Sequence, residues 1–242
     1  MNSQQTLRAL IFDVDGTLAD TERDGHRPAF NAAFAEAGLG WDWDAELYTE
    51  LLTVTGGKER IAAYARRHAP EFMTAADAEQ RIRELHAAKT RHYLALLATG
   101  AIPLRAGVAE LLVAAHGAGL RLAIATTTTP ENVTALLPPE LMALFEIVGA
   151  GDTVPNKKPA PDIYRWVLAQ LALPPEACLA IEDSGPGLLA ARGAGLATLV
   201  TPCDQTNAHD FHGAMAVLPS LEGLSVSLLS SWQSTYIGNK KI

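Results

Sequence analysis

Short apolar runs recur along this chain, and several of them end at charged or hydroxyl side chains. The runs cover residues 7–12, 120–125, 145–148, 178–181 and 197–200, and their lengths are typical of buried strands. From residue 107 onward they alternate with segments of helical pattern. Because strands that alternate with helices build a parallel sheet covered by helices on both faces, the sequence predicts an α/β fold with a doubly wound, Rossmann-like sheet.

The stretch between the first two runs has a different pattern. Residues 26–98 are helical in pattern, with Phe30 and Phe34 near one helix face, and they contain no strand-like run. The sequence therefore predicts an α-helical domain inserted into the α/β core. The predicted bounds are 22–98 for the insert and 1–21 with 99–242 for the core, with residues 232–242 as a polar tail.

Charge and cysteine content limit the partners and the compartment. The formal net charge of the 242 residues is −8. An acidic surface repels nucleic acid and anionic lipid, so neither is an expected partner, and an anionic substrate needs local cationic side chains or a metal ion. Cys178 and Cys203 are too few to staple a chain of this length. No segment has the pattern of a signal peptide or a membrane span, so a cytoplasmic location is expected.

The first apolar run ends in the segment Asp13-Val14-Asp15-Gly16-Thr17. Alternate residues of a strand face the same side, so both carboxylates can reach one point at the carboxyl edge of the sheet, where ligands bind in open α/β folds. Two close carboxylates repel each other unless a cation or a proton relieves them, and Mg²⁺ prefers carboxylate oxygens. The alternative is a strand end with two solvated aspartates and a glycine turn.

Three later segments also place polar side chains after apolar runs. Thr126, Thr127, Thr128 and Thr129 precede a predicted helix, where hydroxyls suit a phosphate oxygen but also a capped turn. Lys158 could neutralise a phosphate or be a solvated loop lysine. Glu182 and Asp183 form a second carboxylate pair, unless Asp183 only caps the next helix. Together with the first segment, they indicate a magnesium and phosphate site at one edge of the sheet.

The ordered set FDVDGT, IAT, KPAPDIY and IEDS resembles the motifs of the haloacid dehalogenase superfamily of phosphohydrolases. The resemblance covers residues 9–218, and the helical insert resembles the small α-helical cap of that family. Within the superfamily, DTERDGHRPAFNAAF, TGGKERIAAY and AGDTVPNKKPAPDIY look like segments of the Calvin-cycle-associated phosphatases that hydrolyse xylulose-1,5-bisphosphate (CbbY type). The resemblance implies a phosphoric monoester hydrolase that acts on a sugar phosphate with Mg²⁺ as its cofactor.

The same resemblance assigns roles at the edge of the sheet. Asp13 is the nucleophile, which forms an aspartyl-phosphate, and Asp15 is the general acid and base. Mg²⁺ is held by Asp13, the backbone carbonyl of Asp15 and Asp183, with Glu182 assisting directly or through water. The phosphate cradle consists of Thr126, Lys158 and the backbone of Val14 and Asp15.

Substrate selection is placed by the resemblance in the helical insert. The candidate substrate-binding residues of the insert are Glu22, His26, Gly56, Gly57, Lys58, Glu59, Arg60, His86 and Lys89, and those of the core are Thr127, Thr128 and Thr129. The two glycines have no Cβ, so their amides can approach an anion closely, and Lys58 and Arg60 could grip a second phosphate. For Arg60, His86 and Lys89 the alternative is a charged helix face in water.

Other activities remain open on the same motifs. A sugar-phosphate mutase of the β-phosphoglucomutase type differs only in passing the phosphoryl group to a sugar instead of water, and a phosphoglycolate-type phosphatase differs in its cap. A halide-removing enzyme is disfavoured, because its chemistry needs neither magnesium nor an acid at Asp15. A phosphorylatable signalling domain is disfavoured, because it lacks the helical insert. The expected partner is a small sugar phosphate, and the expected state is a monomer.

Overall fold

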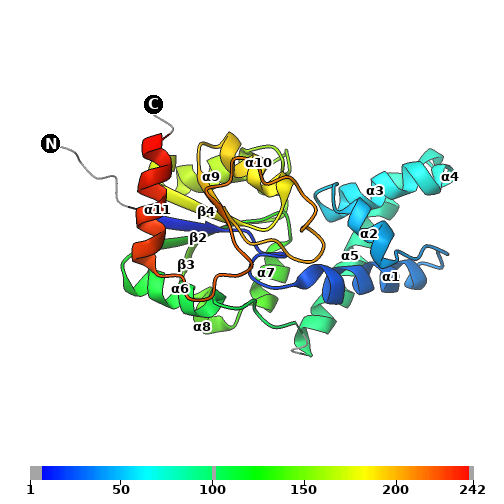
Figure 1. Cartoon of the computed structure of the whole chain (residues 1–242). Coiled ribbons are helices and arrows are strands. Elements are labelled where there is room, and N and C mark those ends of the chain that lie inside the picture. The colour runs from blue at the N-terminus through cyan, green and yellow to red at the C-terminus, as the bar shows by residue number, and fades with distance from the viewer. Residues whose placement is uncertain (1–6, 100–101, 240–242) are drawn as a thin grey trace. The chain divides into compact units, whose positions relative to one another are not determined.

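The computed structural model of the chain describes residues 7–99 and 102–239. The chain divides into two compact units, Met1–Asp20 with Leu104–Ile242, and Thr21–Pro103, here called unit 1 and unit 2. Both are drawn in Figure 1. The predicted bounds of the helical insert, 22–98, lie inside unit 2, and its role as a substrate-selecting cap stays a prediction.

Unit 1 is built on a six-stranded sheet in the order β3-β2-β1-β4-β5-β6, in which all neighbouring strands are parallel. The strands are β1 (Ala9–Phe12), β2 (Arg121–Ala125), β3 (Phe145–Gly149), β4 (Cys178–Glu182), β5 (Ala197–Val200) and β6 (Ala216–Val217). The chain runs from β1 outward to β2 and β3, and then returns to place β4 on the other side of β1. The predicted doubly wound α/β fold is confirmed.

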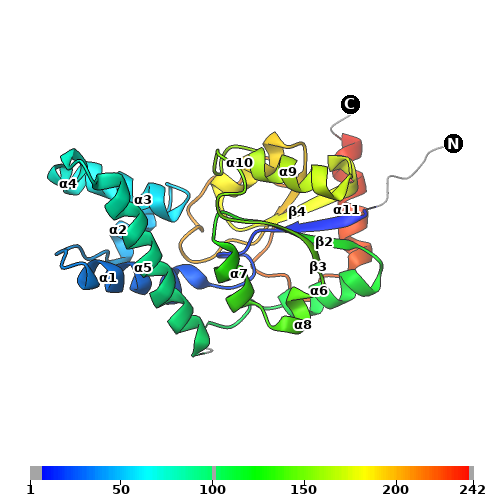
Figure 2. The same ribbon diagram turned by 180° about the vertical axis from the view of Figure 1, so that it is seen from behind.

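Helices cover both faces of this sheet. They are α6 (Val108–Gly117), α7 (Pro130–Leu136), α8 (Pro139–Met142), α9 (Asp162–Leu171), η2 (Pro175–Ala177), α10 (Gly185–Gly193) and α11 (Val226–Asn239). Figures 1 and 2 show α9 and α10 on one face, and α6 with α8 on the other. Helix α9 packs on β2 and β3, α10 packs on β4 and β5, and α11 packs on α6 and β5.

The two faces of the central strands carry side chains of different size. On the α9 and α10 face, the buried strand residues are mainly small: Ala9, Ile11, Ala123, Ala125, Cys178 and Ala180. These residues let Tyr164, Val167 and Leu171 of α9 approach the sheet. Because side chains alternate along a strand, Asp13 and Glu182 continue the rows of this same face at its carboxyl edge.

Unit 2 is helical in the part of the chain that the structure describes. Its elements are η1 (Glu22–His26), α1 (Arg27–Glu36), α2 (Ala45–Leu51), α3 (Gly57–His68), α4 (Pro70–Thr74) and α5 (Ala78–Ala98). Aromatic side chains fill its centre: Phe30, Phe34, Trp43 and Tyr48 are almost fully buried, and Trp43 lies 4.6 Å from Phe30 and 4.9 Å from Phe34 between ring centroids. The helical insert thus has a core of its own.

The predicted C-terminal tail is wrong for residues 232–239, which form the second half of α11. Leu229 and Gln233 are fully buried, and Gln233 Nε2 donates a 2.6 Å hydrogen bond to the carbonyl oxygen of Cys178. The helix is rich in serine and has only a narrow apolar face, so the sequence pattern indicates a helix weakly. Packing on α6 and β5 stabilises the helical conformation. Residues 240–242 lie outside the described residues.

No described helix combines the length and the apolar composition needed to cross a membrane.

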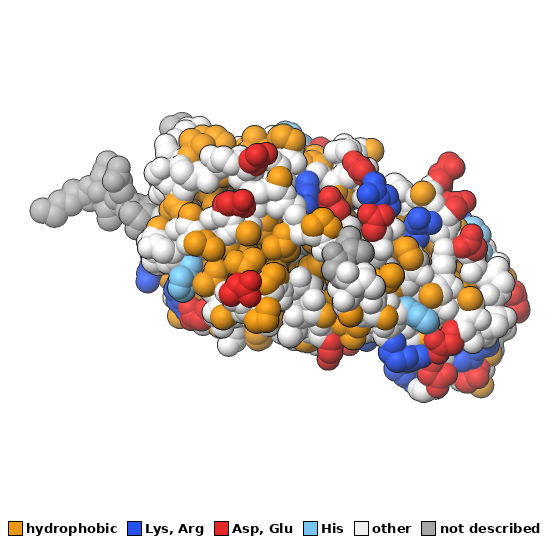
Figure 3. Space-filling view, turned by 90° about the horizontal axis from the view of Figure 1, so that it is seen from below, with side chains coloured by type: hydrophobic (Ala, Val, Ile, Leu, Met, Phe, Trp, Pro, Cys, Tyr) orange, Lys and Arg blue, Asp and Glu red, His pale blue; other side chains and the backbone are white. Residues whose placement is uncertain are grey.

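Hydrophobic side chains gather on the face of unit 1 shown in Figure 3, whereas charged side chains of both signs are frequent on unit 2. The exposed large hydrophobic residues of the described chain are Val113, Leu189, Val217 and Leu228. They come from α6, α10, β6 and α11, so these four residues are spread over four elements of unit 1.

Candidate active site

The carboxyl ends of three neighbouring strands bring the predicted polar residues together in unit 1. Asp13 follows β1, Thr126 follows β2, and Glu182 ends β4 with Asp183 directly after it. The backbone N–H of Asp13 donates to the carbonyl oxygen of Ile181 at 3.0 Å, which extends the pairing of β1 with β4 to Asp13. This edge lies where the chain reverses its direction of strand addition, the usual ligand position in open α/β sheets.

Lys158, in the loop between β3 and α9, brings a positively charged side chain to this edge of the sheet. Its Nζ atom donates to Asp13 Oδ1 at 2.7 Å and to Glu182 Oε1 at 2.6 Å. The Lys158 side chain is 4% exposed and the Glu182 side chain is 0% exposed. The alternative of a solvated loop lysine is therefore excluded, because this ammonium group is buried between two carboxylates from different strands.

Glu182 orients this lysine and is itself held by other groups. The hydroxyl of Tyr164, on α9, donates to Glu182 Oε1 at 2.6 Å, and the Asp183 N–H donates to Oε2 at 3.3 Å. Gly187 makes room for the carboxylate, since a Cβ at this position would lie 2.0 Å from Glu182 Oε2. A residue with a side chain at 187 would displace Glu182, and with it the position of Lys158.

Burial and neighbouring charges shift the pKa values of these groups. Burial raises the pKa of Asp13 to about 7, with the charge of Lys158 opposing the rise and the charge of Glu182 adding to it. Burial works to lower the pKa of Lys158, but the Asp13 and Glu182 carboxylates outweigh it and raise the pKa. Burial, followed by the Glu182 charge, raises the pKa of Tyr164, so this hydroxyl stays a donor.

The residues at this edge fit a divalent cation. Asp13, Glu182 and Asp183 are buried and offer carboxylate oxygens that lie within 4.8 Å of one another. Three carboxylates and one ammonium leave two negative charges, which a single Mg²⁺ would balance, and Mg²⁺ binds through one or two carboxylates and keeps other sites for water or phosphate. Because Lys158 and Tyr164 already occupy Glu182 Oε1, Asp13 and Asp183 are the better direct ligands.

A tight loop carries Asp15 past the end of β1. The Gly16 N–H donates to the carbonyl oxygen of Ala19 at 2.8 Å, and the Asp15 side chain is partly exposed. Gly16 has φ +82°, and a Cβ there would lie 2.2 Å from Asp183 Oδ2. Only glycine allows the loop to approach Asp183 this closely. The carboxylate of Asp15 is outside the group of three metal-ligating candidates, while its charge raises the pKa of Asp13 as a minor cause.

The four threonines after β2 have different environments. Thr126 Oγ1 accepts from the Thr128 N–H at 3.2 Å, and Thr128 Oγ1 accepts from Asn132 Nδ2 at 2.9 Å. Thr129 is the N-cap of α7, where its hydroxyl accepts from the Asn132 N–H at 3.4 Å. Thr128 and Thr129 thus shape the turn, and Thr127 is partly exposed.

Unit 2 joins Glu22 and Arg60 through a tyrosine. The hydroxyl of Tyr48 donates to Glu22 Oε2 at 2.5 Å, and Arg60 Nη1 donates to the same hydroxyl at 3.0 Å. Arg60 Nε also donates to the carbonyl oxygen of Val54 at 3.2 Å. The residue is 7% exposed, so the alternative of a charged face in water is wrong for Arg60.

The other predicted residues of unit 2 form a second group. Lys89 Nζ lies 2.7 Å from His26 Nδ1, and it also lies 5.1 Å from the Phe30 ring centroid and 4.9 Å from the Tyr93 ring centroid. Lys89 is 4% exposed, which excludes the solvated alternative for this residue as well. The surroundings of this ammonium group therefore include an imidazole nitrogen and two aromatic faces.

The glycine pair opens α3 beside two of the remaining candidates. Gly56 has φ +93°, and a Cβ there would lie 2.2 Å from Glu59 Oε2, while a Cβ at Gly57 would lie 2.6 Å from the His86 ring. Gly56 is therefore favoured by its positive φ and Gly57 by the close His86 ring, and both reasons lie within unit 2, apart from any ligand. His86 and Lys58 are partly exposed and Glu59 is exposed.

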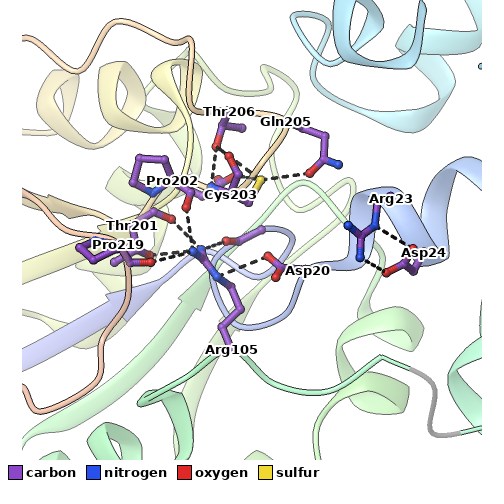
Figure 4. A network of polar contacts seen from close by, with 12 residues as sticks. Asp20, Arg23, Asp24, Arg105, Thr201, Pro202, Cys203, Gln205, Thr206 and Pro219 are labelled. Atoms are coloured by element: carbon purple, nitrogen blue, oxygen red, sulfur yellow. Dashed lines mark hydrogen bonds and ion pairs between the residues drawn. The ribbon is translucent and has the colours of Figure 1, made fainter. Parts of the chain in front are cut away.

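Several residues of these sites gave no signal in the sequence. Tyr164 and Cys203 are neutral, and neither follows an apolar run directly. Cys203 Sγ lies 3.5 Å from Asp183 Oδ2. Tyr48 lies in a helix whose pattern indicated only burial. Arg105 follows a proline-containing linker, and Figure 4 shows its guanidinium pointing at backbone carbonyl groups of three segments.

The chain matches a family model described as haloacid dehalogenase-like hydrolase over residues 7–195. It is 53% identical to protein CbbY (plasmid) of Cupriavidus necator over 219 residues, which cover 89% of this chain and 86% of that protein.

Two solved structures of CbbY from Rhodobacter sphaeroides are similar to this chain. One is a complex with phosphate and has a TM-score of 0.82 at 47% identity, covering 90% of this chain and 96% of the other. The second is a mutant in complex with xylulose-1,5-bisphosphate, with a TM-score of 0.82, 48% identity and the same coverage. The resemblance inferred from the motifs is confirmed.

Proposed function

Because this chain belongs to the haloacid dehalogenase-like hydrolases and is a phosphatase related to CbbY, we propose that it hydrolyses xylulose-1,5-bisphosphate to xylulose 5-phosphate, with Mg²⁺ and an aspartyl-phosphate on Asp13. The observation that carries the proposal is the buried group of Asp13, Lys158, Glu182 and Asp183 at one edge of the sheet. The substrate is supported by the similar protein that was solved with this bisphosphate.

In the first step, a carboxylate oxygen of Asp13 attacks the phosphorus atom, and the bond between phosphorus and the sugar oxygen breaks. Asp15 gives its proton to the leaving oxygen, so that the sugar departs as a neutral alcohol. Lys158 keeps Asp13 oriented and offsets the negative charge that gathers between the carboxylate and the phosphoryl group.

In the second step, water attacks the aspartyl-phosphate. Asp15, now ionised, takes the proton of that water, and the bond between phosphorus and the Asp13 oxygen breaks to release inorganic phosphate. Each residue ends in its starting protonation state, so the cycle needs no further reactant. Splitting one displacement into two lets the same pair of carboxyl groups serve both halves.

Asp13 and Asp183 would hold the Mg²⁺ ion, with Glu182 assisting. When bound, Mg²⁺ supplies electrostatic stabilisation of the phosphoryl oxygens and offsets the charge of the carboxylates. The raised pKa of Asp13 reflects the cost of ionising this carboxyl in a buried acidic group, and a nearby cation favours the ionised form that attack requires.

For unit 2 we propose the role of a cap that selects the substrate. Its support is the presence of two buried cations, Arg60 and Lys89, in a chain whose formal net charge is −8. Arg60 lies in a network with Glu22 and Tyr48, and Lys89 contacts His26. The proposed substrate-binding set also contains Gly56, Gly57, Lys58, Glu59, His86, Thr127, Thr128 and Thr129.

A panel of phosphate esters tests this function. Xylulose-1,5-bisphosphate, 2-phosphoglycolate, β-glucose 1-phosphate and p-nitrophenyl phosphate are incubated with the enzyme, with Mg²⁺ or with EDTA, while free phosphate and sugar products are measured. We expect the bisphosphate to have the highest kcat/KM, with phosphate release that requires Mg²⁺. Faster turnover of phosphoglycolate, or an isomerised sugar phosphate in place of free phosphate, would assign one of the two alternative activities.

The proposal also covers the oligomeric state, the cellular location and the metabolic role of the protein. We propose that the enzyme acts as a monomer in the cytoplasm and that its reaction belongs to the Calvin cycle, in line with the resemblance. The two described cysteines, Cys178 and Cys203, are buried and unoxidised, as in a reducing compartment. Sedimentation at micromolar concentration and cell fractionation test the state and the location.

A further inference from the structure

We infer that Arg105 is a positioning residue for Asp183, because its one guanidinium group holds both of the segments that flank this carboxylate. The inference rests on the metal site of the proposed function. It concerns a residue that lies outside the group of carboxylates and that contacts neither the phosphate cradle nor the candidate ligands directly in the described contacts.

One flank of Asp183 is the loop that follows the nucleophile. Gly16 lies so close that a Cβ would stand 2.2 Å from Asp183 Oδ2, so the backbone of this glycine forms one wall of the carboxylate's position. Arg105 Nη1 donates a hydrogen bond to the Gly16 carbonyl oxygen. The Arg105 N–H also donates to the Leu18 carbonyl oxygen at 2.9 Å, which secures the same loop a second time.

The other flank is the segment that follows β5. Cys203 Sγ lies 3.5 Å from Asp183 Oδ2, a contact in which the thiol is the donor. A turn fixes this thiol, since the Cys203 N–H donates to Thr206 Oγ1 at 2.9 Å and the Thr206 N–H donates to the Cys203 carbonyl oxygen at 3.0 Å. Both Cys203 and Thr206 are at most 5% exposed.

Arg105 anchors this second flank at the two residues that precede Cys203. Its Nη1 atom donates to the Thr201 carbonyl oxygen at 2.6 Å, and its Nη2 atom donates to the Pro202 carbonyl oxygen at 2.7 Å. Figure 4 shows the guanidinium among these carbonyl groups, with Cys203 and Thr206 in the adjoining turn. The Thr201 N–H donates to the Glu182 carbonyl oxygen at 2.7 Å, so the segment is also tied to β4.

Arginine suits this task better than any other residue. Its five N–H donors lie in one plane and in fixed directions, and the group stays charged at every pH of interest. The Arg105 side chain is only 10% exposed, and its ion pair with Asp20, 3.3 Å from Nε to Oδ1, involves a partner that is 59% exposed. The backbone acceptors, rather than this screened ion pair, therefore define its position.

The test is a calorimetric titration of the phosphate-free enzyme with Mg²⁺, which reads metal binding without turnover. Residues that orient a metal ligand without contacting the metal typically contribute 10- to 100-fold to metal affinity. R105M should therefore raise the Kd for Mg²⁺ by about 10-fold or more. The matched control is R121M. Arg121 also donates to a backbone carbonyl oxygen and a carboxylate, but at the amino end of β2, and its loss should leave the Kd within about twofold.

The controls separate the inference from the proposed function. If the wild type binds no Mg²⁺, the proposed metal site fails, and the inference fails with it. If the wild type binds Mg²⁺ and R105M binds it equally well, or if R121M weakens binding as much as R105M does, the inference alone is overturned. Chemical denaturation of both variants accounts for any general loss of stability.

A second pair of variants leaves Arg105 in place and decides the question if R105M does not fold. C203A removes the thiol donor beside Asp183 and should raise the Kd for Mg²⁺ by about threefold to 10-fold. C203S keeps a donor at nearly the same position and should restore binding to near the wild-type value. Equal Mg²⁺ affinity in wild type, C203A and C203S would overturn the inference.

Discussion

Each unit contains a buried lysine, and the two lysines have different surroundings. Lys158 and Lys89 are both 4% exposed. Lys158 lies between Asp13 and Glu182 at the ends of two strands, whereas Lys89 contacts the His26 ring nitrogen and the faces of two aromatic rings. The comparison teaches that a buried cation can be stabilised in two ways, by carboxylates at the edge of a sheet or by contacts that include aromatic faces in a helical core.

The largest effect is expected from D13N, which removes the proposed nucleophile but keeps the shape of the side chain. Phosphate release should fall by at least about 10³-fold, as when a covalent catalyst is removed elsewhere. The measurement is a continuous phosphate assay with xylulose-1,5-bisphosphate, together with circular dichroism for the fold. E146Q is the matched control, because Glu146 is 46% exposed and pairs with Arg121 at the other end of the sheet. Normal turnover by D13N would remove Asp13 from the mechanism.

K158M should reduce both activity and stability. Loss of one stabilising donor typically costs about 10²–10³ in kcat, and two buried carboxylates would lose their shared cation, which costs about 3–5 kcal/mol in the free energy of unfolding. Guanidinium titrations and phosphate assays measure the two effects. The neighbouring K157M, which loses a hydrogen bond to the Gly151 carbonyl oxygen and an ion pair with the 67% exposed Asp152, should cost less, about 2 kcal/mol. Equal losses in both variants would contradict the special role of Lys158.

The metal-free protein should lose stability as the pH rises. The pKa of Asp13 is raised from 3.8 to about 7, so the folded state holds this proton more tightly than the unfolded chain. The stabilisation is complete below about pH 4 and is lost as the pH rises to about 7, an effect on the order of a few kcal/mol. Denaturation in EDTA at pH 4.5 and pH 8 measures it. D13N should flatten the dependence, and an equally steep curve in D13N would assign it to other groups.

K89M should give the smallest effect and one confined to the choice of substrate. Loss of a charged hydrogen-bond donor costs about 1.5–3 kcal/mol, so kcat/KM for xylulose-1,5-bisphosphate should fall by about 10- to 100-fold. Turnover of p-nitrophenyl phosphate, which has a single phosphate, should change less than threefold. The control R83M alters an exposed cation of the same helix. An equal loss of kcat/KM for both substrates would indicate that Lys89 supports the folding of unit 2 and not the choice of substrate.

The sequence predicted the grouping of polar side chains at the candidate site of unit 1 better than the surroundings of the polar groups of unit 2. Asp13, Glu182 and Asp183 follow apolar runs, and Lys158 lies in the loop after another run. Parallel strands necessarily bring their carboxyl ends to one edge. In unit 2, helical spacing shows which residues share a face but not which face becomes buried. The sequence therefore could not exclude that Lys89 is exposed to water, because its burial depends on the packing of α1 on α5.

Other parts of unit 1 were beyond prediction because their role depends on distant partners. Arg105 donates hydrogen bonds to the carbonyl oxygens of residues 16, 201, 202 and 219. Every residue has a backbone carbonyl group, so the sequence does not indicate which of them a distant arginine contacts. Tyr164 was apparent only as an apolar position of α9, although its hydroxyl reaches Glu182. The second half of helix α11 was missed because one of the two buried residues of the helix, Gln233, is polar, and serine and threonine residues interrupt the apolar pattern.

The central claim is best tested by locating the phosphoryl group on the protein. D15N lacks the base for the second step but needs no acid for a good leaving group, so p-nitrophenyl phosphate and Mg²⁺ should leave it phosphorylated. Mass spectrometry of the quenched, digested D15N protein should then find one phosphoryl group, on the peptide that contains Asp13, and none in the D13N/D15N double variant. A phosphoryl group on any other residue, or equal labelling of the double variant, would contradict the account.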